Sequence, residues 1–269
     1  MSFGVLTRYA YCYIYMQRVT QAHRTDGFGS QFQNLLWTLL WAENNGKIFT
    51  YTDIGHIDLI SNSATIKDTE DENTLDEALD YISIRQNHPS SENGVEVIPS
   101  AIAYSFVESN IDTVFNSDSF HRFKELFYVS KKRPFDTDFT HVAVHIRRLG
   151  NWERENNTFR SGTHDIPNTY FLNVINRVRS EHSNKKLKFH IYSQGSTTEP
   201  YFLEFASDDT VFHLNEKVLD TFTSLVFADI LVTARSSFSY VAALLSNNIV
   251  YYSPFWHPPL RQWIPTLMQ

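Results

Sequence analysis

Two adjacent arginines, Arg147 and Arg148, stand where a predicted strand ends. Residues 141–146, read HVAVHI, alternate branched apolar residues with smaller or polar ones, and this period of two predicts a strand with one face on a core. In a parallel α/β sheet, ligands bind in the crevice beyond the carboxyl ends of the strands. The planar fork of N–H donors in arginine suits a diphosphate. The alternative interpretation is that both arginines form ordinary surface ion pairs.

A second stretch combines a buried strand, predicted over residues 228–234, with a helix predicted over residues 240–245. The turn between them is rich in hydroxyl groups and contains Arg235, Ser236, Ser237, Phe238 and Ser239. A strand followed by a polar turn and a helix start presents backbone N–H groups and a favourable dipole to an anion. Serine at such a place is also favoured as a simple helix cap. Together with the arginine pair, the turn predicts an anion site.

A glycine turn precedes the first predicted helix, which covers residues 31–43. Gly27 and Gly29 bracket Phe28, and glycine allows a backbone to approach a ligand closely. The pattern is too short for the dinucleotide-binding fingerprint. A tight turn with no ligand is the other interpretation.

These three motifs resemble those of the α1,2-, α1,6- and protein-O-fucosyltransferase superfamily. They are the strand with His145-x-Arg147-Arg148, the turn of residues 236–239, and the segment of residues 27–31, and they occur in the family's order between about Asp26 and Pro254. The resemblance implies an α/β fold of the GT-B-like kind, with two Rossmann-like domains facing across a cleft. It also implies an inverting, metal-independent transfer of a sugar. Two positions depart from the family's pattern: Gly150 stands where Asp is usual, and Arg235 where a small polar residue is commoner.

The resemblance further implies roles for individual residues. Arg148, supported by Arg147, would neutralise the diphosphate in place of a metal ion, and the turn of residues 236–239 would hold the other phosphate oxygens. The expected donor site therefore comprises His145, Arg147, Arg148, Ser236, Ser237, Phe238, Ser239, Gly27, Gly29 and His213. Glu155 is the first candidate for the catalytic base, because α1,6-fucosyltransferases carry a glutamate at the matching place. His164 and Asp165, in the same long polar loop, are the alternatives.

The donor stays open between two nucleotides. A carboxylate accepts hydrogen bonds well from guanine, so Glu216 favours GDP-fucose. His213 or Asn215 would suit uracil equally, so a UDP-sugar such as UDP-xylose is the alternative. The expected acceptor is an oligosaccharide or a glycoprotein glycan. A different class also fits Gly150: a non-catalytic carbohydrate-binding module that keeps the GT-B shape.

Composition sets the broad limits. The chain has 269 residues, of which 42% are hydrophobic and 20% charged, as in a soluble globular protein. A net charge of −7 argues against partners such as nucleic acid or anionic membrane. Cys12 is the single cysteine, so we expect no disulfide framework and no thiolate metal site. The family resemblance implies that no metal is required, and we expect no cofactor beyond the nucleotide-sugar donor. The apolar run 9–16 is too short for a membrane span and lacks a cleavage site. We therefore expect a cytoplasmic protein, bacterial or, if viral, in the host cytosol.

The order of predicted elements divides the chain at the basic linker, residues 131–138. Residues 1–135 are expected to form the N-terminal Rossmann-like domain on the acceptor side, with strands at 9–16 and 47–52, a polar loop at 17–26 and a helix at 119–128. Residues 136–269 are expected to form the nucleotide-sugar-binding domain, with strands at 187–193, 211–214 and 249–252 and helices at 167–179 and 219–227. By analogy with GT-B enzymes, a tail helix after Phe255 would cross back onto the first domain.

Overall fold

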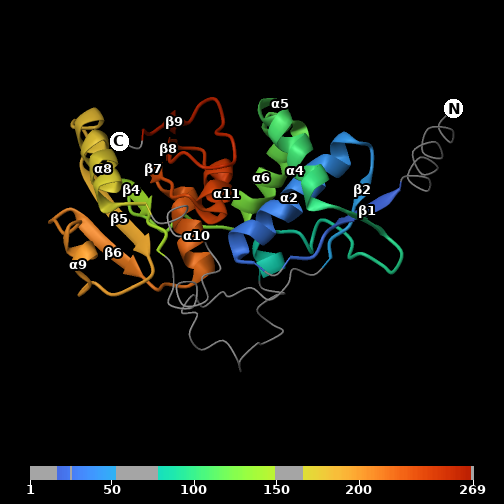
Figure 1. The fold of residues 1–269 in the computed structure, drawn as a ribbon, viewed down its shortest axis with the longest axis horizontal. Helices are drawn as coiled ribbons and strands as arrows, with labels where there is room; N and C mark the ends of the chain where they lie inside the picture. Colours follow the sequence, from blue (N-terminus) through green and yellow to red (C-terminus); the bar gives the residue numbers. More distant parts are fainter. Residues whose placement is uncertain (1–16, 25, 53–77, 149–165, 268–269) are drawn as a thin grey trace, which may run out of the picture.

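The computed structural model describes residues 17–24, 26–52, 78–148 and 166–267. It holds two parallel β-sheets with helices packed around them, and the two groups of elements lie side by side (Figure 1). The three-stranded sheet has the order β2-β1-β3, and the six-stranded sheet has the order β6-β5-β4-β7-β8-β9. The chain passes from the first sheet to the second between residues 130 and 139.

The first sheet contains β1 (Arg18–Gln21), β2 (Ile48–Phe49) and β3 (Glu96–Ile98). Its helices are α2 (Phe28–Asn44), α4 (Ser100–Ser109), α5 (Ile111–Phe115) and α6 (Asp118–Val129). The prediction of a loop at 17–26 was wrong for residues 18–21, because β1 lies there and pairs in parallel with both neighbours. Thr52 partners two polar side chains at the carboxyl end of β1. Its hydroxyl lies 2.5 Å from Thr20 Oγ1, and its carbonyl accepts a hydrogen bond from Gln21 Nε2 at 2.5 Å. The strand predicted at 9–16 lies outside the described residues.

The second sheet contains β4 (Thr140–His145), β5 (Leu187–Ser193), β6 (Thr210–Leu214), β7 (Ile230–Val232), β8 (Ile249–Tyr252) and β9 (Ile264–Pro265). Its helices are α8 (Asn168–Glu181), α9 (Pro200–Leu203), α10 (Val218–Phe227) and α11 (Ser237–Leu245). All neighbouring strands are parallel. The chain winds from β4 out to β6, then returns to the other side of β4 with β7, which is the doubly wound Rossmann order. The α/β class and the strands predicted in this half are confirmed.

The predicted tail helix is wrong for the part of the tail that the structure describes. Residues 253–263 form no helix, and β9 follows as an edge strand beside β8. Thr266 N donates to the carbonyl of Tyr252 at 3.0 Å and continues this ladder. Prolines at 258, 259 and 265 explain the difference, because proline lacks the N–H that a helix needs. The tail does reach the first half, since His257 Nδ1 lies 2.5 Å from Glu108 Oε1 on α4.

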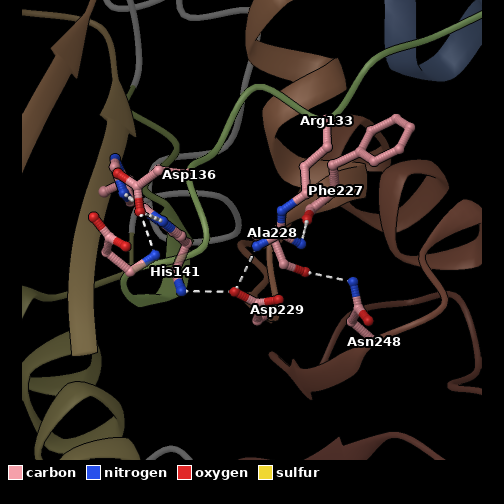
Figure 2. Close-up of polar contacts among 9 residues, drawn as sticks. Arg133, Asp136, His141, Phe227, Ala228, Asp229 and Asn248 are labelled. Carbon is pink, nitrogen blue, oxygen red and sulfur yellow. Dashed lines mark hydrogen bonds and ion pairs between the residues drawn. The ribbon is translucent and has the colours of Figure 1, made fainter. Parts of the chain in front are cut away.

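The linker between the sheets is fastened to the amino end of β7 (Figure 2). Arg133 donates to Asp229 Oδ2 at 2.8 Å and to the carbonyl of Phe227 at 3.1 Å. The same Asp229 oxygen accepts from the backbone N–H of His141 at 2.8 Å. One carboxylate therefore joins the linker, β4 and β7 at the amino ends of the strands. Ligands of such sheets bind at the opposite, carboxyl ends.

Helices α2 and α11 hold the two halves together. A hydrophobic core extends from α2 and its neighbours into α10 and α11. A Cβ built on Gly29 would overlap the backbone N and Cα of Phe238 and would lie 2.8 Å from the carbonyl carbon of Ser237. The ring of Phe28 packs edge-on against Phe222 of α10, with centroids 5.4 Å apart. Glycine at position 29 is therefore needed so that the two helices can touch backbone to backbone.

We expect Gly29→Ala to destabilise the fold. Alanine stabilises an ordinary helix by up to about 1 kcal/mol relative to glycine, but here its methyl group must push two backbones apart, and overpacking costs about 1–3 kcal/mol. Urea unfolding should show a net loss. Gly27→Ser is the matched control, because no atom lies within 4 Å of its Cβ position and serine is a good N-cap. Equal unfolding midpoints for the two variants would contradict the assigned contact.

Candidate anion-binding site

The site lies where the winding of the six-stranded sheet reverses, between the carboxyl ends of β4 and β7. His145 is the last residue of β4, and its ring lies 5.4 Å from the ring of Phe238 on α11. Its Nδ1 is buried and has no hydrogen-bond partner among the described residues. Burial, and secondarily Arg147, lowers the pKa of His145 to about 3, so the ring is neutral near pH 7. A neutral imidazole with an unsatisfied nitrogen thus stands at the switch point.

The hydroxyl-rich turn is the start of α11. Ser236 is the N-cap, and its Oγ accepts from Phe238 N at 3.3 Å. The buried Ser239 Oγ accepts from Ala234 N at 3.1 Å and so closes the turn onto β7. Ser237, the first residue of α11, is half-buried. The cap interpretation therefore holds for Ser236, and the positive end of the α11 dipole lies at this turn.

The two arginines have different surroundings. Arg148 is buried, with 6% of its surface exposed. Its Nη1 donates to the carbonyl of Ile166 at 2.9 Å, its Nη2 donates to Asn168 Oδ1, and its guanidinium lies 5.4 Å from the centre of the Tyr201 ring. Asn168 in turn donates to the carbonyl of Tyr201 at 2.6 Å. These contacts tie the end of β4 to the starts of α8 and α9.

Arg147 is only half-buried, and its Nη1 donates to the carbonyl of Arg148 at 3.2 Å. It therefore lies closer to solvent than its neighbour does. The sequence alone cannot tell which of two consecutive arginines is buried. Alternation places them on opposite sides of the chain, but it does not show which side is covered by other parts of the protein.

The glycine turn lies at the same place. Gly27 is the N-cap of α2, and Gly29 in the first turn of α2 meets Ser237 and Phe238 in the first turn of α11. The close approach that Gly29 permits is thus made by protein backbone. Gly29 lies in the first turn of α2, and Ser237 and Phe238 lie in the first turn of α11, so the positive ends of these two helix dipoles converge beside His145.

Sequence reasoning missed Gln33. It is fully buried in α2, and neither end of its side-chain amide has a hydrogen-bond partner in the described part of the chain. Helical spacing places it between Gly29 and Trp37, on the face that packs against α11, where Trp37 lies 6.2 Å from Tyr240. A buried, unpaired amide is costly and is usually met by water or ligand. The signal was available: a polar residue four positions after Gly29 in an apolar helix.

The residues proposed to read the nucleobase lie two strands away, at the end of β6. His213 uses both ring nitrogens, Nε2 at 2.8 Å from His190 Nδ1 and Nδ1 at 2.7 Å from Glu216 Oε1. The amide of Asn215 is paired with the backbone N–H and carbonyl of Gly195, at 3.0 and 2.7 Å. These side chains already have protein partners, in contrast to His145.

The structure therefore brings together the glycine turn, His145, Arg147 and the first turn of α11, and it holds Arg148 in a protein contact beside them. Glu155, His164, Asp165 and Gly150 lie outside the described residues. In the described part of the chain, no group of three or more His, Cys, Asp or Glu side chains is arranged to hold a metal ion. None of the described helices is long and apolar enough to cross a membrane.

Comparison with known proteins gives matches among solved structures alone: no protein-family model and no curated protein matches the sequence. The fucosyltransferase NodZ from Bradyrhizobium is 13% identical, with 88% of this chain and 95% of that chain covered and a TM-score of 0.41. The E. coli heptosyltransferase WaaC with ADP-2-deoxy-2-fluoro heptose is 12% identical, with coverage of 93% and 92% and a TM-score of 0.42. The E. coli ADP-heptose lps heptosyltransferase II is 8% identical, with coverage of 93% and 90% and a TM-score of 0.43. The function proposed below rests on the geometry of the chain's own residues.

We expect Arg148→Lys to lower the free energy of unfolding by about 1.5–3 kcal/mol, which is the contribution of a hydrogen bond from a charged group. The reason is that lysine cannot donate to the Ile166 carbonyl and to Asn168 together. Arg147→Lys, the matched control, should change the free energy of unfolding by less than about 0.5 kcal/mol. Guanidinium unfolding of both variants checks this difference. Equal losses would show that the arginines share one structural role.

Proposed function

We propose that this protein is a glycosyltransferase that binds the diphosphate of a nucleotide-sugar between the amino ends of α2 and α11. One observation carries the proposal: the first turns of these two helices touch at Gly29 and Phe238, next to the switch point where β4 delivers His145 and Arg147. Two converging positive dipole ends and a guanidinium form a site for a dianionic group. The crevice at a switch point is also where doubly wound sheets bind nucleotides.

The residues divide the work by their surroundings. Arg147 would contact the diphosphate and stabilise the charge that develops on it as the sugar leaves. Arg148 would act as a positioning residue, because its donors hold the end of β4 against α8. Ser237 and the α11 dipole would bind the remaining phosphate oxygens. His145 would offer the unpartnered Nδ1 as a neutral hydrogen-bonding group.

The reaction we propose is an inverting transfer onto a glycan hydroxyl, with a base that takes the proton of the acceptor. Glu155, His164 and Asp165 are the candidates for this base. GDP-fucose is the first choice of donor, and a UDP-sugar such as UDP-xylose is the second. Arginine and helix dipoles would supply the positive charge that a divalent ion supplies elsewhere, so we propose that neither metal nor cofactor takes part.

We expect a nucleoside diphosphate to stabilise the protein against heat. A ligand at 100 times its Kd adds about 2.7 kcal/mol, which corresponds to roughly 5–10 °C for a chain of this size. The measurement is a thermal-shift series with GDP, UDP, ADP and their sugars. Arg147→Ala should abolish the shift, while Arg177→Ala on the exposed face of α8 should keep it.

Stabilisation of the wild type by a glycan and by none of the nucleotides would overturn the proposal. It would favour the carbohydrate-binding module instead, because such a protein has no use for the diphosphate site. A shift with one base alone would settle the choice between guanine and uracil.

We expect transfer to persist in millimolar EDTA, since the charge on the leaving diphosphate would be met by Arg147 and by two helix ends. Release of nucleoside diphosphate from the donor, measured with and without EDTA in the same preparation, checks this. A rate that falls with EDTA and returns with Mg²⁺ or Mn²⁺ would show that a metal ion supplies the charge.

A further inference from the structure

Three histidines on neighbouring strands form a continuous line of hydrogen-bonding contacts. His141 Nδ1 on β4 lies 2.8 Å from His190 Nε2 on β5, and His190 Nδ1 lies 2.8 Å from His213 Nε2 on β6. A carboxylate closes each end: Asp136 Oδ1 is 3.1 Å from His141 Nε2, and Glu216 Oε1 is 2.7 Å from His213 Nδ1. We call these five residues the histidine chain.

The sheet dictates this line. In the parallel register, Ala143 is opposite His190 and Tyr192 is opposite His213, so each histidine stands two positions further along its strand than the one before. A step of two residues keeps the side chain on the same face, and the chain therefore runs diagonally across one face from the start of β4 to the end of β6. Phe135 stacks on His141 with centroids 4.6 Å apart, and Tyr192 stacks on His213 at 4.5 Å. These rings hold the imidazoles in place.

Counting protons shows what the chain requires. It contains four links, and each needs one proton between its two atoms. Three neutral imidazoles carry one N–H each, and ionised carboxylates carry none. With three protons, one of the links would hold no proton, and lone pairs of its two atoms would face each other there. Four filled links therefore require one extra proton, and an imidazolium between two carboxylates supplies it.

The extra proton belongs at an end of the chain. Burial, and secondarily the neighbouring imidazoles of His213 and His141, lowers the pKa of His190 to about 3, so the central ring stays neutral. The His213 side chain is 21% exposed and that of His141 is 2% exposed, so a charge is better solvated at the Glu216 end. His190 can remain neutral there, since it donates from Nε2 to His141 and accepts at Nδ1 from His213.

We propose that Asp136, His141, His190, His213 and Glu216 share one proton beyond those of three neutral imidazoles, and that this proton links the state of the interdomain linker to that of the loop after β6. Asp136 belongs to the linker, at the amino ends of the strands. Glu216 belongs to the loop after β6, at the carboxyl ends of the strands, where ligands of such sheets bind. Loss of the proton opens one link. The linker at Asp136 and the loop at Glu216 thus respond together to pH, whatever the protein binds.

Other charges face the chain from the elements around it. On β5, Lys188 faces His190 and Asp136 and lies over the ring of Phe139 at 5.1 Å. Just before β7, Asp229 faces His141, and Arg133 of the linker pairs with it at 2.8 Å. Lys188 disfavours an additional cation near the Asp136 end, which again places the extra proton beside Glu216.

The test reads the tautomer of each ring by ¹⁵N NMR of histidine-labelled full-length protein near pH 7. In the wild type, we expect one imidazolium among the three rings. In Glu216→Gln, the amide N–H can fill the last link, so all three rings should become neutral with the proton on Nε2. In Asp136→Asn, the amide fills the first link, and all three rings should carry the proton on Nδ1.

The decisive measurement is the ¹⁵N signal of His213, which lies at the end of the histidine chain far from Asp136. Both substitutions are nearly isosteric, and the exposed His121 on α6 serves as an internal control whose signals should not change. Loss of the Nε2 proton of His213 in Asp136→Asn, which leaves a neutral ring with the proton on Nδ1, supports the proposal, because only a continuous histidine chain transmits the change across two strands. A change confined to His141 overturns it. Three neutral rings in the wild type would overturn it equally.

Discussion

The arrangement of this protein depends on the close approach of α2 and α11. No side chain separates Gly29 from the backbone of Phe238, so the first turns of two helices from different halves of the chain are in direct contact. Aromatic rings surround this contact, among them Phe28, Phe222 and Phe238, and they form a core that neither sheet could complete alone. The distance between the halves is therefore set by backbone rather than by adjustable side chains, and close-packed interiors leave little freedom around it.

The same contact has an electrostatic consequence. Each helix brings the positive end of its dipole to one place, and Arg147 adds a full charge. Asp26, just before α2, is paired with Arg24, whose Nε lies 3.0 Å from Asp26 Oδ1. His145 adds no charge, since burial keeps it neutral. The result is a small region of positive potential lined by a neutral, unsatisfied imidazole, which is a setting suited to an anion with a polar group attached.

One face of the six-stranded sheet carries a line of polar side chains. His141, Ala143 and His145 alternate with Val142 and Val144 along β4, so both histidines lie on the face opposite to the second hydrophobic core. Their positions along the strand separate them. His141 finds a partner in His190 on β5, whereas His145, at the carboxyl end of β4, is opposite Tyr192, and its Nδ1 has no hydrogen-bond partner among the described residues. Position along one strand thus distinguishes a histidine whose ring nitrogens have protein partners from one whose Nδ1 has none in the described part of the chain.

Local patterns in the sequence determined much of this fold. Period-two alternation located β4, period 3.6 located α2 and α6, and the succession of strands and helices from residue 140 onward predicted a Rossmann-like half with the arginines at a strand end. Polar β1, the short β3 and the strand in the tail were not predicted, because their stability comes from parallel partners far away in sequence.

Only the tertiary structure decided the partners of the site residues. It buried Arg148 against Ile166 and Asn168 and left Arg147 nearer to solvent. It also filled the space above Gly29 with another helix and joined His213 to a chain that begins at Asp136. The physical reason is that propensity and periodicity act over a few residues along the chain, whereas burial, charge and hydrogen bonding depend on which distant residues the fold brings within a few ångströms.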